Sequence, residues 1–113
     1  DSKTTPILDD DILGTLRNNL GNDTVTELIE DFKIIGYQSI EQFKAAASEH
    51  DVEAMTRNAH DLKTNAATLG LLCLSERARE VEFACKENRM EDAKSLSTDL
   101  TATLEVSIST LEN

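Results

Sequence analysis

Apolar residues recur every three or four positions along most of the chain, which is the spacing of amphipathic α-helices. The cleanest such stretch lies between Asp51 and Gly70, and its apolar positions are Val52, Met55, Ala59, Leu62, Ala66 and Leu69. Asp51 can cap the first turn, and Gly70 can end the last one. The pattern therefore predicts a helix over residues 52–69.

The rest of the chain shows the same spacing in four further stretches. Acidic residues after Asp9 and the glycine at Gly21 predict a short helix over 9–20. Three longer helices are predicted over 24–47, 74–87 and 91–111. The first of these three carries its apolar residues at Val25, Leu28, Phe32, Ile35, Ile40 and Phe43. Since short connections join the four long helices, the sequence predicts an all-α fold, an antiparallel up-down four-helix bundle with a short additional N-terminal helix.

Length and composition narrow this picture. The chain has 113 residues and no Pro/Gly-rich linker after Pro6, so we expect a single domain over 1–113 with a polar lead-in at 1–6. The formal charge of −11 disfavours nucleic acid and anionic membrane surfaces as partners and favours a partner with basic surface. No run approaches the roughly 20 apolar residues that a membrane helix requires.

The candidate chemistry lies on the predicted helix over 52–69. His60 follows the core position Ala59, so its imidazole should lie at the edge of the buried stripe, rooted in the fold yet open to solvent. The same strip of the helix carries Thr56, Arg57, Lys63, Thr64 and Ala67. A neutral imidazole can attack phosphorus, and Lys63 could steady the transferred anion. Small side chains at Thr64, Ala66 and Ala67 would let another protein approach the ring.

The next helix should contribute a second group of side chains. A hairpin around Gly70 sets residues near Glu82 antiparallel to His60. Glu82 could accept a hydrogen bond from the imidazole and fix its tautomer, while Lys86, one turn further on, could face a phosphoryl group. The alternative is that both charged residues simply form part of a solvated face.

A motif begins at His60 and reads H-D-L-K-T-N-A-A-T-L-G up to Gly70. It resembles the motif of histidine-containing phosphotransfer domains, H-x-L-K-G followed by small residues and a glycine ten positions after the histidine. The chain is most similar to such domains at the C-terminal end of bacterial hybrid sensor kinases. The resemblance implies that His60 is phosphorylated and that Lys63 stabilises the phosphate. Thr64 replaces the usual glycine, so docking of a partner should be slower or more selective.

The resemblance also implies a role in a phosphorelay. We expect His60 to accept a phosphoryl group from a phospho-aspartyl receiver domain of a hybrid sensor kinase and to pass it to the receiver of a response regulator. The chain has no Gly-rich phosphate loop, so it should lack ATP-dependent kinase activity and bind no cofactor, with Mg²⁺ supplied by the partner receiver. We expect a monomer in the cytoplasm, either free-standing or as the C-terminal domain of a membrane-bound sensor kinase.

Three other interpretations compete with the carrier, and the residues argue against the first two. His60 to Thr64 also looks like the start of the phosphoacceptor box of a kinase dimerisation domain, although Asn65 stands where that motif has proline. A di-metal bundle would need glutamate three residues before its histidines, and Arg57 and Ala47 occupy those positions. A helical adaptor that binds a signalling partner without chemistry is also compatible with the sequence.

Overall fold

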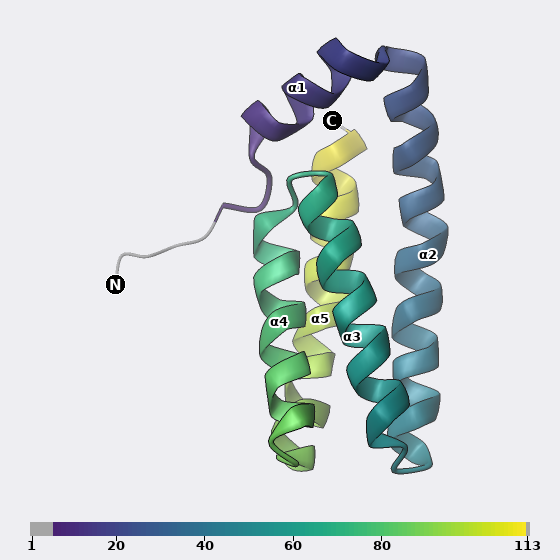
Figure 1. The fold of residues 1–113 in the computed structure, drawn as a ribbon, viewed down its shortest axis with the longest axis vertical. Coiled ribbons are helices and arrows are strands. Elements are labelled where there is room, and N and C mark those ends of the chain that lie inside the picture. The colour runs from purple at the N-terminus through teal and green to yellow at the C-terminus, as the bar shows by residue number, and fades with distance from the viewer. Residues whose placement is uncertain (1–5, 113) are drawn as a thin grey trace.

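The structure is a computed structural model that describes residues 6–112, and every regular secondary-structure element in that range is an α-helix (Figure 1). The helices are α1 (Asp10–Leu20), α2 (Asn22–Ser48), α3 (Val52–Thr68), α4 (Leu72–Lys86) and α5 (Met90–Glu112). The prediction of an all-helical chain is confirmed. Residues 1–5 of the predicted polar lead-in lie outside the described residues.

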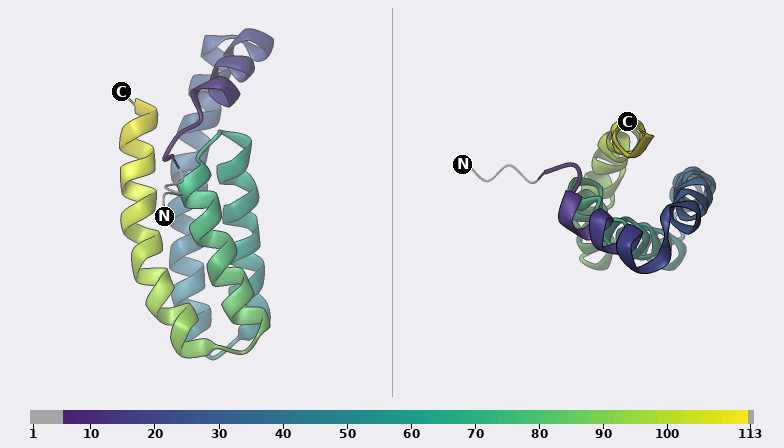
Figure 2. Two further views of the ribbon diagram at one scale, coloured as in Figure 1. Left: turned by 90° about the vertical axis from the view of Figure 1, so that its left-hand side faces the viewer. Right: turned by 90° about the horizontal axis from the view of Figure 1, so that it is seen from above.

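The four longer helices lie side by side, and consecutive helices run in opposite directions (Figure 1). Each helix from α2 to α5 contacts the next along the chain, and α5 also contacts α2. The shorter α1 contacts α2 and crosses the end at which α3 turns into α4, as the view from above shows (Figure 2). This arrangement sets α3 and α4 lengthwise against each other, which positions the candidate site.

The core consists of the apolar stripes of the four long helices. On α3 and α4 the buried positions include those that the sequence pattern predicts, which are Met55, Ala59, Leu62, Ala66, Leu74, Ala78, Val81 and Cys85. Burial of each large side chain among them, Met, Leu or Val, contributes roughly 1.5–3 kcal/mol to the stability of the fold. The backbone of α3 under the candidate histidine is therefore held by packing along its whole length.

Helix α2 is rotated relative to the stripe expected from the sequence. Ile35 was expected to be part of the apolar stripe but is 41% exposed, while Ile29 is buried. The rotation follows from Gly36, because a Cβ atom there would lie 3.0 Å from Cδ1 of Leu104 on α5. Gly36 therefore faces the core, and Ile35, about 100° away around the helix, turns outward.

Two helices, α2 and α4, begin two residues earlier than the sequence suggested. Gly21, with φ of 89°, is both the C-cap of α1 and the N-cap of α2, so α2 begins at Asn22 rather than at residue 24. Helix α4 begins at Leu72 rather than at residue 74. Its first turn forms directly after Gly70, whose carbonyl oxygen accepts a hydrogen bond from the Leu72 backbone N–H at 3.0 Å. The α3–α4 connection is therefore short and tight.

We expect Gly70→Ala to destabilise the protein by about 1–2 kcal/mol, because Gly70 has φ of 80° and alanine disfavours that conformation. A Cβ atom there would also lie 3.0 Å from the carbonyl oxygen of Asp9, whose N–H donates to the Gly70 carbonyl oxygen at 2.8 Å. Urea denaturation followed by circular dichroism measures the change. Gly14→Ala is the matched control, because a Cβ at Gly14 meets no atom within 4 Å and alanine should stabilise α1. Equal effects of the two substitutions would contradict the structural role assigned to Gly70.

Candidate functional site

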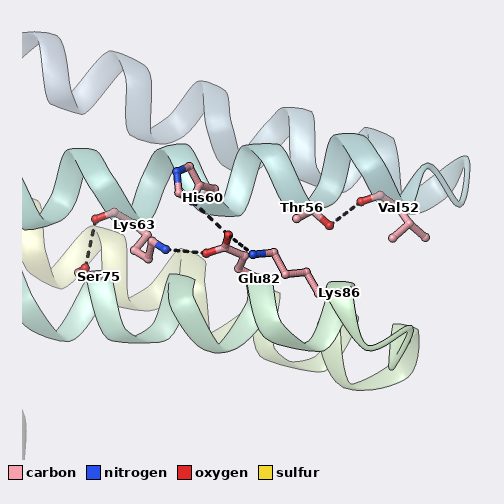
Figure 3. A network of polar contacts seen from close by, with 7 residues as sticks. All are labelled: Val52, Thr56, His60, Lys63, Ser75, Glu82 and Lys86. Atoms are coloured by element: carbon pink, nitrogen blue, oxygen red, sulfur yellow. Dashed lines mark hydrogen bonds and ion pairs between the residues drawn. The ribbon is translucent and has the colours of Figure 1, made fainter.

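His60 lies in the middle of α3, on the flank that faces α4 (Figure 3). The helix begins where the Asp51 carboxylate accepts a hydrogen bond from the Ala54 backbone N–H at 3.1 Å. Its neighbour Ala59 is buried, whereas the His60 side chain is 54% exposed. The imidazole thus stands on a rigid helix with one edge against the protein and the other open to solvent.

The inner edge of the ring contacts Glu82 of α4. Nδ1 of His60 lies 3.1 Å from Oε2 of Glu82, and the same oxygen is 3.1 Å from Nζ of Lys86. The other carboxylate oxygen, Oε1, accepts a hydrogen bond from Nζ of Lys63 at 2.8 Å. Figure 3 shows the carboxylate between α3 and α4 with these three partners around it. We call these four side chains the Glu82 network.

The network stabilises a buried negative charge. The Glu82 side chain is only 6% exposed, and this burial by itself would raise the pKa of its carboxyl group. Hydrogen bonds from Lys63, Lys86 and His60 outweigh the burial and lower the pKa of Glu82 to about 2. Glu82 is therefore ionised at neutral pH and acts only as a hydrogen-bond acceptor.

An ionised Glu82 determines which ring nitrogen of His60 is available for chemistry. Because Nδ1 points at a carboxylate, the proton of the neutral imidazole is assigned to Nδ1, where it can be donated to Glu82. The lone pair then lies on Nε2, the nitrogen that has no partner in the Glu82 network. The arrangement presents one oriented nucleophilic nitrogen toward solvent.

An open groove runs along α3 and α4 beside the ring. Its lining residues are Val52, Glu53, Thr56, Arg57, His60 and Glu82. Arg57 is exposed one turn before His60, while the hydroxyl of Thr56 donates to the carbonyl oxygen of Val52 at 2.8 Å. A partner that enters this groove would meet a guanidinium group and the exposed edge of the imidazole.

The structure separates the small residues that were expected around the ring. Thr64 and Ala67 are exposed on the outer face of α3, as expected for residues that border an approaching partner. Ala66 was expected both in the apolar stripe and beside the ring, and it is buried, which confirms its place in the core stripe through Ala59 and Leu62 and removes it from the accessible face. Only two of the three small side chains therefore line the accessible face.

The structure brings Glu82, Lys86 and Lys63 together at His60, while their roles in catalysis stay predictions. Lys63 was expected to stabilise a transferred phosphate, and in this structure its ammonium group is hydrogen-bonded to Glu82, as is that of Lys86. Ser75 was not predicted from the sequence, and its hydroxyl donates to the carbonyl oxygen of Lys63 at 3.1 Å. A single serine in the first turn of α4 gives no sequence signal for this contact. The hydrogen bond helps to hold α3 and α4 in register.

Residues 6–112 contain no group of three or more His, Cys, Asp or Glu side chains arranged to hold a metal ion. The described helices also include none that is both long enough and apolar enough to cross a bilayer.

Comparisons with known proteins place these observations in context. The family model described as the Hpt domain matches residues 10–111, which include all four residues of the Glu82 network. The chain is also similar to the crystal structure of histidine-containing phosphotransfer protein B (HptB) from Pseudomonas aeruginosa PAO1, with a TM-score of 0.90 and 20% sequence identity. The match covers 96% of this chain and 94% of that one, and at this identity it shows a shared fold. No curated protein matches the chain.

Proposed function

The chain belongs to the Hpt domain family, and on that premise we propose that it accepts a phosphoryl group on His60 from a phospho-aspartyl receiver domain and passes it to the receiver of a response regulator. The observation that carries the proposal is the orientation of the imidazole. Glu82 occupies Nδ1 from the buried side, which leaves Nε2 free on the exposed side of α3. The donor would be the receiver of a hybrid sensor kinase.

The transfer forms one bond and breaks another at phosphorus. The Nε2 lone pair attacks the phosphorus atom of the partner's aspartyl phosphate, and the P–O bond to the carboxylate breaks with its electron pair leaving on that carboxylate. Nδ1 keeps its proton throughout and continues to donate to Glu82. The reverse reaction at a second receiver regenerates neutral His60, so this chain needs no cofactor of its own.

The two lysines have different tasks in this proposal. Lys63 lies one turn after His60 on the same helix, and its ammonium group can exchange its contact with Glu82 for one with the incoming phosphoryl oxygens. Lys86 approaches the Glu82 carboxylate from α4 and can keep it neutralised when Lys63 moves. Glu82 would then stay ionised and continue to orient the ring.

The exposed face of α3 would receive the partner, with the four long helices as an antiparallel up-down scaffold. Thr56 and Arg57 lie on one side of His60 along the helix, and Thr64 and Ala67 on the other. Thr64 adds a branched side chain where related motifs have glycine, which should make docking slower or more selective. Gly70 has a structural part, because it ends α3 and lets α1 pack across the α3–α4 turn.

The proposal assigns the metal and the nucleotide chemistry to other proteins. Mg²⁺ would be held by the receiver domain, and the chain would have no ATP-dependent kinase activity of its own. We further propose that it acts as a monomer in the cytoplasm, where the receiver domains of two-component systems would reach it.

A label-transfer experiment tests this function. A receiver domain carrying ³²P on its aspartate is incubated with the purified chain and Mg²⁺, and a second receiver is then added. We expect acid-labile, base-stable label to appear on the chain and then to leave for the second receiver, with no labelling from ATP alone. Labelling from ATP alone would contradict the carrier mechanism. Partner binding without any label, across a panel of receivers, would establish the adaptor interpretation instead.

A further inference from the structure

Helix α4 carries an exposed aromatic side chain with a cation over its ring. The guanidinium carbon of Arg79 lies 5.0 Å from the centroid of the Phe83 ring. Phe83 is 45% exposed, although the aromatic residues Phe32 and Phe43 are buried in the core. A cation–π contact of this kind holds an otherwise flexible arginine in place on the surface. Arg79 and Phe83 thus form a preorganised pair outside the core.

The contacts of α4 place this pair next to the candidate site. Ser75 bonds the carbonyl oxygen of Lys63, and Glu82 bonds His60, so both ends of this segment of α4 touch α3. Arg79 lies between these two contacts and therefore opposite the turn of α3 that carries the phosphoacceptor. Phe83 directly follows Glu82 and turns outward by about 100°. Phe83 also lines a surface hollow with Leu96 of α5, so the pair extends from the candidate site toward α5.

Charge is distributed unevenly over the helices. Helix α5 has five acidic residues and one lysine, and α2 has five acidic residues and two lysines. By contrast, α3 has two acidic and two basic residues, and α4 has three of each. Lys63 and Lys86 bond the buried Glu82 carboxylate beside the imidazole. Arg57 lines the groove next to the ring, and Arg79 lies on the next turn of α4. The surface around His60 is thus far less acidic than the rest of the molecule, even with Glu53 and Asp61 on the same helix.

We propose that Arg79 and Phe83 form a docking anchor for the receiver domain, with Arg79 directed at carboxylates around the partner's phosphoryl site and Phe83 covered by the partner's surface. The proposal rests on the phosphorelay function above. A protein that holds Mg²⁺ beside a phospho-aspartate needs several carboxylates there, and these complement the cationic surface around His60. Arginine and aromatic residues are the side chains that contribute most at protein interfaces. The acidic back of the molecule would disfavour docking in other orientations.

Transfer kinetics with a phosphorylated receiver test the anchor. We expect Arg79→Gln and Phe83→Ala each to raise KM for the receiver about five- to tenfold with little change in kcat, because the Glu82 network stays intact. Arg77→Gln is the matched charge control, since Arg77 pairs with Glu80 at 3.5 Å on another face of α4. Ile34→Ala is the matched apolar control, because Ile34 is 59% exposed on α2. Thermal unfolding of each variant verifies that the fold is retained.

Three results would overturn the anchor while leaving the relay intact. Unchanged KM in both variants would show that the partner does not contact this pair. An equal rise in KM with Arg77→Gln would show that only net charge matters. Self-association of the chain that Phe83→Ala abolishes, measured by sedimentation, would show that the pair contacts a second copy instead. Failure of the proposed function itself is distinct, because the wild-type chain would then take no label at all.

Discussion

His60→Gln should abolish phosphoryl labelling of the chain while leaving its fold intact. Glutamine has no nucleophilic ring nitrogen, but its amide N–H can still donate to the Glu82 carboxylate. Because the His60 side chain is 54% exposed, the substitution should change the free energy of unfolding by less than about 1 kcal/mol. The measurement is acid-labile, base-stable ³²P on the chain after incubation with a phosphorylated receiver and Mg²⁺, together with urea denaturation of the same samples.

The second histidine of the chain supplies the control. His50 lies in the turn between α2 and α3 with φ of 56°, a backbone conformation that asparagine tolerates well. His50→Asn should therefore keep both the fold and full labelling. Label that survives in His60→Gln but disappears in His50→Asn would move the phosphoacceptor to the turn and refute the site described above.

The sequence predicted the helical elements well where packing repeats regularly. On α3 the three-four alternation from Met55 to Ala66 matches the buried positions. The match follows because residues three and four apart lie on the same face of a straight helix. On α2 the same reasoning placed Ile35 inward, and it is exposed. The rotation of α2 depends on the close approach of Leu104 to Gly36, a contact between residues far apart in sequence. Periodicity within one helix carries no information about such a contact.

The candidate site was likewise predicted in part: features set by the geometry of one helix or hairpin were predicted, and features set by contacts between helices were not. The position of His60 at the edge of the core stripe follows from helical geometry within α3, and the antiparallel hairpin brought Glu82 opposite it. The sequence did not reveal that Lys63 and Lys86 both bond the Glu82 carboxylate. The outcome depends on the burial of Glu82, since a buried carboxylate attracts the nearest cations more strongly than a solvated one does. The exposed Arg79–Phe83 pair could not be predicted from the sequence for a related reason, because the packing of α4 on its neighbours decides which of its side chains are exposed.

The second large effect is expected on stability from Glu82→Gln. The folded protein lowers the pKa of Glu82 from 4.5 to about 2, which corresponds to roughly 3 kcal/mol of stability. Since the pKa is lower in the folded state, this stability is fully present above about pH 4.5 and is lost as the pH falls through about 2. Glu82→Gln should therefore lower the free energy of unfolding by up to about 3 kcal/mol at pH 7. Toward pH 2 the difference from wild type should shrink.

Urea denaturation at pH 7, 5 and 3 measures this difference, and Glu80→Gln is the control. Glu80 is a neighbouring glutamate of α4 whose partner Arg77 lies 3.5 Å away on the surface. Exposed ion pairs of this kind contribute less than about 1 kcal/mol, so the control should remain close to wild type at every pH. A Glu82→Gln deficit that is as large at pH 3 as at pH 7 would mean that shape and packing, not the ionised carboxylate, account for the effect.

The same variant separates the stabilising part of Glu82 from its effect on the imidazole. A carboxylate beside Nδ1 favours the tautomer with the proton on that nitrogen, whereas a glutamine amide can present either an oxygen or an N–H to the ring. We therefore expect ¹⁵N spectra of His60 above pH 8 to show the Nδ1–H tautomer in wild type and a mixture in Glu82→Gln. Phosphoryl transfer should slow in proportion to the Nδ1–H fraction that is lost, because only that tautomer exposes a lone pair on Nε2. Slower transfer with an unchanged tautomer would assign the effect of Glu82 to its lysine partners and not to the orientation of the histidine.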